Sequence, residues 1–261
     1  MTIRFALPAS LGAARAAARA ELIKSALETV LGEDVSVELA SDYASLVALA
    51  LAGSVDLLWA PAVVCARLED EAAIVAKTVR GGHTTYCSAL VARRDANLAT
   101  RRLTGKRAAW VDRTSLGGHL LAVEHLRRLG LSADAVFARQ EFVGSYPEAV
   151  RSVIDGEADV CAIFVPEDDP KLVERALGLL AGPARAAQLG ALFVSDAVPT
   201  DAIVVTRSLA EPRRSAVVER LFPFHEARPR PAAFCLAMEV DAFERAQPGE
   251  YASLRGLWSA S

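Results

Sequence analysis

The residues best suited to binding chemistry lie in one stretch, VDRTSLGGHLLAVEHL, at positions 111–126. Its apolar start predicts a strand, and the amphipathic run that begins near Ser115 predicts a helix. Such a helix start directs unsatisfied N–H groups and the positive end of the helix dipole at the carboxyl edge of the sheet, where α/β proteins bind anions. Gly117 and Gly118 let a ligand approach the backbone, and Thr114 and Ser115 can donate hydroxyl hydrogen bonds.

The same residues also have a purely structural explanation. Thr114 or Ser115 could serve only as the N-cap of the helix, and the two glycines could only permit close packing against a neighbouring strand. The residues alone favour neither explanation over the other.

Signatures of catalysis and metal binding are missing from the sequence. His83, His119, His125 and His225 are scattered, and the chain has no Gly-x-Ser-x-Gly elbow and no P-loop. The four cysteines lie far apart in apolar segments without CxxC spacing, so we predict buried free thiols at Cys65, Cys87, Cys161 and Cys235. We expect no metal and no cofactor.

Composition and charge argue against several classes of partner. The chain has 261 residues, of which 52% are hydrophobic and 23% charged, so it can bury a sizeable core. Its 29 basic and 32 acidic residues are spread along the sequence and give a net charge of −3, so we expect no nucleic-acid partner. A helix that crosses a bilayer needs about 20 consecutive apolar residues. The longest candidate in this chain is interrupted by Asp56, so we expect no membrane insertion.

The N-terminal residues loosely imitate an export signal, because Arg4 precedes the apolar FALPASLGAA. Arg15 and Arg19 fit such a signal poorly. We predict instead a strand in IRFAL and an amphipathic helix in AARAAARAELIKSALETVL. The cellular location stays open: cytoplasmic for the chain as it stands, or periplasmic if a signal was removed.

Strands and helices alternate along the chain. We predict strands in VSVEL (35–39), VDLLWAP, AAIVAKTVR, TTYCSALVAR, KRAAWVD (106–112), VFARQEFV and ADVCAIF (158–164), and helices in DYASLVALALAG, LGGHLLAVEHLRRLG and YPEAVRSVIDGE. This alternation predicts an α/β protein with mainly parallel sheets flanked by helices. We find no internal repeat in the sequence.

Two segments are suited to cross between lobes. CSALVARRDAN runs from an apolar strand into a polar turn, and ALFVSDAVPTDAIVVTRSL (191–209) places a proline-bearing loop between two strands. We therefore predict one lobe from residues 1–90 and 200–261, a second lobe from residues 91–199, and two hinge crossings. Clefts between hinged lobes are favoured ligand sites.

An ordered set of motifs covers most of the chain. They are DYASLVALALAGSVDLLW, YCSALVAR, LTGKRAAWVD, SLGG, FVGSYPEAV, GEADV, SDAVPTD and FERAQPGEYASLR. In this order they resemble the phosphonate, phosphite and phosphate binding proteins of ABC importers, which have the two-lobed type II periplasmic-binding-protein fold. The resemblance implies a solute-binding protein that captures a small, anionic ligand between its lobes and works with an ABC permease.

The resemblance also implies further ligand-binding residues. Tyr43 and Tyr86 match tyrosines that face the cleft in the family, and Trp59 ends a strand on the same side. Asp196 and Asp201 flank the loop where the family places a carboxylate for the ligand's amine. Core packing remains an alternative for the aromatic residues, and a solvated turn for one of the two acids.

The departures from the family pattern concern the ligand itself. The family holds phosphonate oxygens with the hydroxyls of an STSG motif, but here Leu116 and Gly117 replace two of the three hydroxyl residues. Each lost hydrogen bond to a charged oxygen costs about 1.5–3 kcal/mol. Tyr146 stands where the family has a histidine. We therefore expect an unusual ligand, either less charged, such as a carboxylate, or larger. A lyase or a cofactor-pathway or natural-product enzyme with this fold remains the alternative function.

Overall fold

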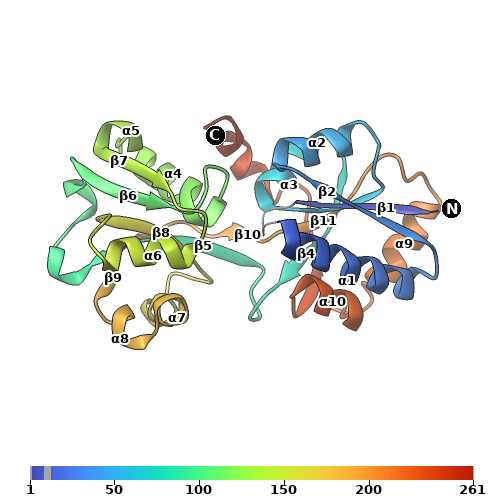
Figure 1. Ribbon diagram of the computed structural model, residues 1–261. Coiled ribbons are helices and arrows are strands. Elements are labelled where there is room, and N and C mark those ends of the chain that lie inside the picture. Colours follow the sequence, from blue (N-terminus) through green and yellow to red (C-terminus); the bar gives the residue numbers. More distant parts are fainter. Residues whose placement is uncertain (1, 9–12, 261) are drawn as a thin grey trace. The chain divides into compact units, whose positions relative to one another are not determined.

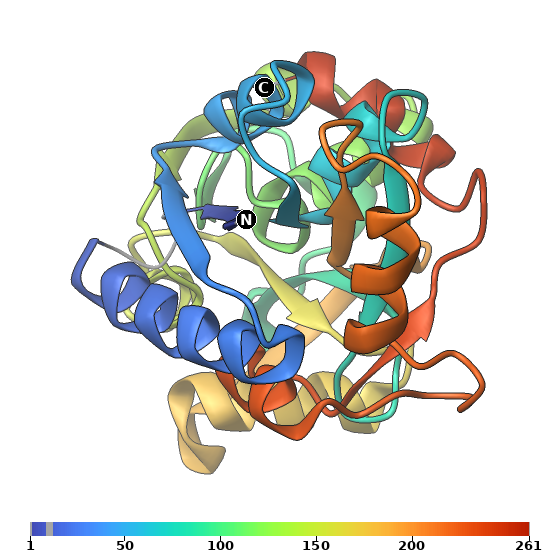
Figure 2. The same cartoon turned by 90° about the vertical axis from the view of Figure 1, so that its right-hand side faces the viewer.

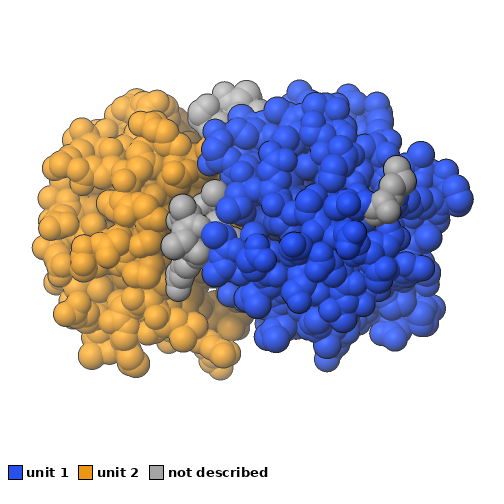
Figure 3. Space-filling view, turned by 45° about the vertical axis from the view of Figure 1, so that its right-hand side comes forward, with its two compact units in different colours: residues 1–84, 199–260 blue, residues 85–198, 261 orange. Residues whose placement is uncertain are grey.

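The computed structural model describes residues 2–8 and 13–260, and the chain divides into two compact units (Figures 1 and 3). Unit 1 comprises residues 1–84 and 199–260, and unit 2 comprises residues 85–198. The chain therefore passes between the units twice. The boundary expected after residue 90 falls inside one continuous strand that begins at Thr85. Residues 9–12, part of the stretch that imitates an export signal, lie outside the described residues.

Unit 1, as far as it is described, contains a six-stranded sheet of order β12-β4-β11-β3-β1-β2. Its strands are β1 (Ile3–Pro8), β2 (Val35–Ala40), β3 (Leu57–Ala60), β4 (Ala73–Val79), β11 (Ala202–Val205) and β12 (Ala242–Arg245). The strand β1 pairs in parallel with β2 and β3, whereas β11 and β12 add antiparallel pairs. The helical segments are α1 (Ala13–Leu31), α2 (Tyr43–Leu51), α3 (Ala62–Leu68), α9 (Arg213–Leu221), α10 (Ala232–Met238) and η4 (Ala252–Ala260).

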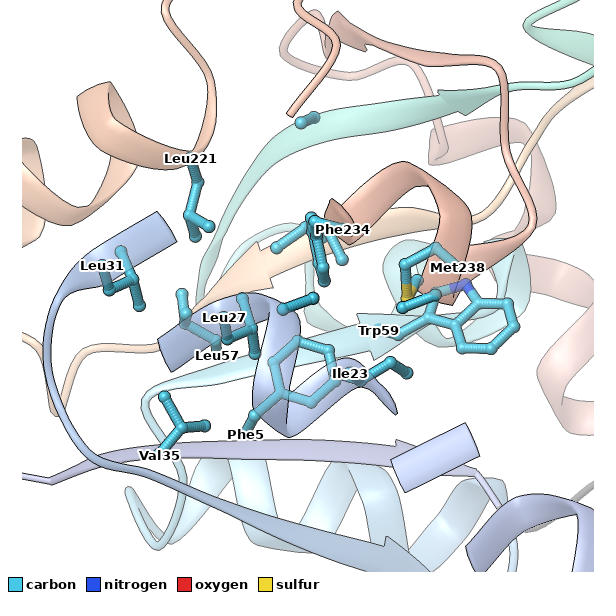
Figure 4. Packing of buried hydrophobic residues seen from close by; sticks show 14 of the residues in the cluster. Phe5, Ile23, Leu27, Leu31, Val35, Leu57, Trp59, Leu221, Phe234 and Met238 are labelled. Atoms are coloured by element: carbon cyan, nitrogen blue, oxygen red, sulfur yellow. The ribbon is translucent and has the colours of Figure 1, made fainter. Parts of the chain in front are cut away.

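Helices cover both faces of the unit 1 sheet. Figure 2 shows α1 and α2 on opposite sides of β1 and β2. The core on the α1 side is shown in Figure 4, where Ile23 and Leu27 of α1 meet Phe5 and Phe234. Because β3 is covered on both faces, all four of its residues are buried, which accounts for its uninterrupted apolar sequence.

Unit 2 contains a second six-stranded sheet among the described residues, of order β10-β5-β8-β6-β7, with β9 also paired to β5. Its strands are β5 (Thr85–Arg93), β6 (Lys106–Trp110), β7 (Phe137–Phe142), β8 (Val160–Val165), β9 (Leu189–Val194) and β10 (Val198–Pro199). The strand β6 is parallel to β7 and β8, and β5 is antiparallel to β8 and β9.

The helical segments of unit 2 also cover both faces of its sheet. They are η1 (Arg94–Ala96), η2 (Thr100–Arg102), η3 (Leu116–Leu120), α4 (Leu121–Arg128), α5 (Ala133–Val136), α6 (Tyr146–Ile154), α7 (Pro170–Ala181) and α8 (Pro183–Ala186). One core joins β5 and β8 to α6 and α7, and another joins the opposite face to α4 and α5. Figure 1 shows α4 and α6 on opposite sides of the sheet.

Both units contain an equivalent arginine–aspartate pair, here called the clamp, and the sequence alone does not reveal this repeat. In unit 1, Asp56 accepts hydrogen bonds from the backbone N–H and the guanidinium of Arg4, at 2.9 and 2.8 Å. In unit 2, Asp159 accepts the equivalent bonds from Arg107, at 2.8 and 3.3 Å. Each pair is separated by 52 residues. The clamp joins the first and third strands of a β-α-β-α-β segment, β1 to β3 and β6 to β8.

Tyr43 and Tyr146 occupy equivalent positions in the two repeats. Tyr43 is the first residue of α2, after the N-cap Asp42, and Tyr146 is the first residue of α6, after the N-cap Ser145. Each cap side chain accepts a backbone hydrogen bond at the start of its helix. Both tyrosines therefore lie directly after the second strand of their repeat, at the carboxyl edge of a sheet.

The four cysteines are buried and free, which confirms the prediction from the sequence. Burial raises the pKa of the Cys87 thiol to about 11, so this thiol stays protonated near neutral pH. None of the described helices is long and apolar enough to cross a membrane.

Candidate functional site

The predicted anion site lies between β6 and α4, where the chain turns back at the carboxyl edge of the unit 2 sheet. Ser115 is the N-cap, and its Oγ accepts a hydrogen bond of 3.1 Å from the backbone N–H of Gly118. The regular helix expected from residue 116 instead begins with the π turn η3, in which the N–H of Leu120 donates to the carbonyl oxygen of Ser115 at 3.0 Å. Such widened turns occur often at functional sites.

The two hydroxyl residues of this turn have different roles. The backbone N–H and the hydroxyl of Thr114 both donate to Asp112 Oδ1, at 2.8 and 2.6 Å, so the proton of the Thr114 hydroxyl is already used. The bond that Ser115 Oγ accepts leaves the Ser115 hydroxyl proton for another partner. Ser115 is therefore the hydroxyl better placed to donate to a ligand.

The two glycines are needed for different reasons. A β-carbon at Gly118 would lie 2.5 Å from Val111 Cγ2, so Gly118 serves the close packing of the turn against the chain that leaves β6. A β-carbon at Gly117 would instead meet the Tyr146 hydroxyl oxygen at 3.0 Å and atoms of Phe164 and Tyr86 at 3.5 Å. The structural explanation thus holds for Gly118, whereas Gly117 lies among three aromatic side chains.

One of these aromatic residues, Phe164, was not predicted as a site residue. It lies near the end of β8, and its ring centroid is 5.1 Å from that of Tyr86 at an interplanar angle of 40°. Tyr86 is 8% exposed and Phe164 is 37% exposed. The sequence places Phe164 in an apolar strand, and this pattern alone cannot distinguish an exposed phenylalanine from a core one.

Two further residues near this turn, Arg113 and His119, were not predicted from the sequence as part of the site. The guanidinium carbon of Arg113 lies 4.4 Å from the ring centroid of Phe142, which places a cation two residues before Ser115. His119 is buried, and its Nδ1 forms a 2.9 Å hydrogen bond with the carbonyl oxygen of Arg113. Burial lowers the pKa of His119, so its imidazole is neutral near pH 7 and donates from Nδ1.

Trp59 of unit 1 lies in the core, but its indole N–H does not donate a hydrogen bond to any described residue. Its ring belongs to the core of the α1 face, next to Met238 in Figure 4, and its side chain is 8% exposed. The guanidinium carbons of Arg19 and Arg80 lie 5.5 and 5.9 Å from the ring centroid. Buried donors without a partner are rare in folded proteins.

The two predicted acids differ in their surroundings. Asp201 is partly buried and forms an ion pair of 3.3 Å with Arg80. Asp196 has an 82% exposed side chain and pairs with Arg128 on the surface of unit 2. Asp196 therefore has the surroundings of the solvated turn acid that was expected for one of the pair. Asp201 shares a neighbour with Trp59, because the guanidinium of Arg80 pairs with Asp201 and lies over the Trp59 ring. Among the described residues, no group of three or more His, Cys, Asp or Glu could hold a metal ion.

The two mixed sheets, each flanked by helices, are the architecture of a type II periplasmic binding protein. The chain belongs to the family of ABC transporter, phosphonate, periplasmic substrate-binding proteins, whose pattern matches residues 5–251. This confirms the resemblance that the motifs indicated and supports a solute-binding role, and it does not favour the enzyme alternative. No protein with a curated description matches the chain.

Several solved structures share the fold. A Xanthomonas citri protein bound to ATP is 18% identical, with a TM-score of 0.78, and the match covers 99% of this chain and 96% of that one. A binding protein component of an ABC phosphonate transporter from Pseudomonas aeruginosa is 20% identical, with a TM-score of 0.71 and coverages of 98% and 85%. PhnD1 from Prochlorococcus marinus in complex with methylphosphonate is 14% identical, with a TM-score of 0.73 and coverages of 99% and 97%.

Proposed function

We propose that the chain captures a phosphonate or a related small oxyanion and holds its charged end at the turn before α4. The observation that carries this proposal is the Ser115 cap, because it joins a hydroxyl with a free proton to the first N–H groups of a helical segment. Such a helix start favours an anion through both its N–H groups and its dipole. In unit 2 we assign the ligand contacts to Ser115, Gly117, Tyr86 and Tyr146, whereas Gly118 serves the packing of the turn and donates its N–H to Ser115.

The remaining predicted site residues differ in whether we assign them to the ligand. Thr114 shapes the turn through its bonds to Asp112, and Asp196 stays with Arg128 at the surface. In unit 1, Tyr43 and Asp201 are assigned to the ligand on the family resemblance, and Trp59 on its unpaired indole N–H. A Trp59→Phe variant tests this last assignment, because it keeps an aromatic ring in the core and removes the donor.

Titration calorimetry with purified protein tests the oxyanion site. Methylphosphonate, phosphate, a sulfonate and a carboxylate form the panel, and we expect a phosphorus oxyanion to bind most tightly. Ser115→Ala removes a hydrogen bond to a charged oxygen and should weaken binding about tenfold or more. Thr114→Val is the matched control, because its hydroxyl bonds to Asp112, and it should change the affinity far less. Equal losses in the two variants would contradict the assignment.

Two further expectations follow from family membership. A substrate-binding protein of an ABC importer works outside the cytoplasmic membrane and delivers its ligand to a permease. Genes for a permease and an ATPase next to the gene for this chain would support that partnership. Mass spectrometry of the ligand after incubation with the protein separates capture from catalysis, since a binding protein releases its ligand unchanged.

A further inference from the structure

A phenylalanine is exposed at the end of a strand that is otherwise buried. Phe164 is 37% exposed, whereas Val160, Cys161, Ala162, Ile163 and Val165 of the same strand are 0% exposed. Core packing requires these five side chains, because β8 lies between β5 and β6 with helices on both faces. The same packing does not require an aromatic ring at position 164.

Phe164 forms an aromatic wall together with its neighbour Tyr86. Their strands are adjacent, and in the antiparallel register Phe164 lies opposite Ser88, two residues along the strand from Tyr86. The two ring centroids are 5.1 Å apart. Ser88 itself ties the wall to the turn, since its hydroxyl donates a 2.7 Å hydrogen bond to the carbonyl oxygen of Gly117.

The wall directly adjoins the turn that we assign to the oxyanion. Atoms of Phe164 and Tyr86 lie 3.5 Å from the place of a β-carbon at Gly117, and the Tyr146 hydroxyl oxygen lies 3.0 Å from it. The three atoms nearest to this position are the Tyr146 hydroxyl oxygen, a ring carbon of Tyr86 and the β-carbon of Phe164, so all three belong to aromatic residues. A group attached to an anion at Ser115 would lie next to the Tyr86 ring, and the Phe164 ring lies beside that ring.

We infer that the ligand is a phosphoryl oxyanion that carries a flat ring, and that this ring packs against Phe164 beside Tyr86. The inference rests on the proposed function, because it takes the oxyanion position from it. A flat ring gains from stacked or edge-on contact with aromatic side chains in addition to the surface that it buries. A methyl substituent is too small to cover the exposed ring. Arylphosphonates and aromatic nucleoside phosphates share the required chemistry.

Calorimetry with three probes tests the inference: methylphosphonate, phenylphosphonate and adenosine 5′-monophosphate. We expect at least one ring-bearing probe to bind about tenfold more tightly than methylphosphonate. Phe164→Leu keeps an apolar side chain and removes the ring, so it should abolish this preference and leave the affinity for methylphosphonate unchanged. Leu179→Ala, at an 82% exposed position of α7, is the matched control and should change neither affinity. Circular dichroism checks that each variant is folded.

The results separate this inference from the function on which it rests. If methylphosphonate binds as tightly as both ring-bearing probes, or more tightly, the proposed function holds and the inference is wrong. The inference also fails if Phe164→Leu weakens all three probes equally, because Phe164 would then support the site as a whole without contacting a ring of the ligand. If no probe binds, the proposed function fails and the inference fails with it.

Discussion

The hydroxyl oxygen of Tyr146 occupies the space beside Gly117: a β-carbon at position 117 would lie only 3.0 Å from it. Tyr146 begins α6, and Gly117 lies in the π turn before α4, so the two residues come from different helical segments. In the resembled family, position 117 carries a hydroxyl and position 146 carries an imidazole. Here the hydroxyl comes from position 146 instead, and the glycine makes room for it.

A double-mutant cycle tests this pairing. Gly117→Ala should weaken methylphosphonate binding, because the added methyl group displaces the Tyr146 phenol. Tyr146→Phe removes the displaced oxygen, so adding Gly117→Ala to it should cost much less than adding it to the natural protein. Contacting residues couple by about 0.5–3 kcal/mol in such cycles. Calorimetry on the four proteins gives the coupling, and strictly additive losses would contradict the pairing.

Gly118 should be far less tolerant of substitution than a glycine in open space. An alanine β-carbon at Gly118 would lie 2.5 Å from Val111 Cγ2 and 2.8 Å from Ser115 Oγ, so the turn would have to open. We expect Gly118→Ala to lower the free energy of unfolding by about 1–3 kcal/mol, as overpacking usually does. Urea unfolding measures the change.

The matched control for Gly118 lies in α7. Apart from its chain neighbours and the backbone of its own helix, no atom lies within 4 Å of the missing β-carbon of Gly178. Because Gly178 lies inside α7, Gly178→Ala should raise the free energy of unfolding by up to about 1 kcal/mol. Similar effects of the two substitutions would show that the turn around Gly118 has room for a methyl group.

The sequence predicts most of the strands in their order, because burial leaves a direct trace in it. The strands β3 and β8 are covered on both faces, and each appears in the sequence as an apolar run that ends near a turn residue. Family membership was also predictable, since it depends on several weak motifs in a fixed order. The structural repeat in which Arg4–Asp56 corresponds to Arg107–Asp159 was not predictable, because the two segments need few identical residues besides this ion pair.

The details of the site depend on tertiary contacts that the sequence does not encode locally. A periodic pattern from residue 116 predicts a helix, but it does not distinguish a π turn from an α turn. Thr114 and Ser115 are equally good caps by type, and only the bond to Asp112 separates them. The exposure of Phe164 likewise depends on what covers β8 near its end.

Lys77 should be important for holding the C-terminal segment to the unit 1 sheet. Its side chain is 7% exposed and forms ion pairs with Glu244, at 3.3 Å, and with Glu250. Lys77→Met leaves Glu250 without its cation, so we expect a loss of about 3 kcal/mol in the free energy of unfolding. Adding Glu250→Gln removes the unpaired charge and should recover part of this loss. Urea unfolding of both variants measures it, and a further loss in the double variant would contradict the ion-pair explanation.

The repeated clamps predict a dependence of stability on pH. Hydrogen bonds from Arg107 hold the pKa of Asp159 below its usual range, and those from Arg4 and Ser208 do the same for Asp56 against the opposing effect of burial. Because both carboxyl groups bind protons less readily in the folded state, their contribution to stability is complete above the unfolded pKa of about 3.9. It decreases as the pH falls through the lower pKa of the folded state.

Asparagine variants isolate this contribution. Asp56→Asn keeps the shape of the side chain and removes its charge, so at pH 7 we expect a loss of about 2 kcal/mol in the free energy of unfolding. At pH 3 and below, the natural aspartate is itself increasingly protonated, and the difference between the two proteins should therefore shrink. Asp159→Asn applies the same test to unit 2. Urea unfolding from pH 7 to pH 2.5 measures both differences, and a difference that stays constant over this range would show that the charge of the clamp does not contribute to folding.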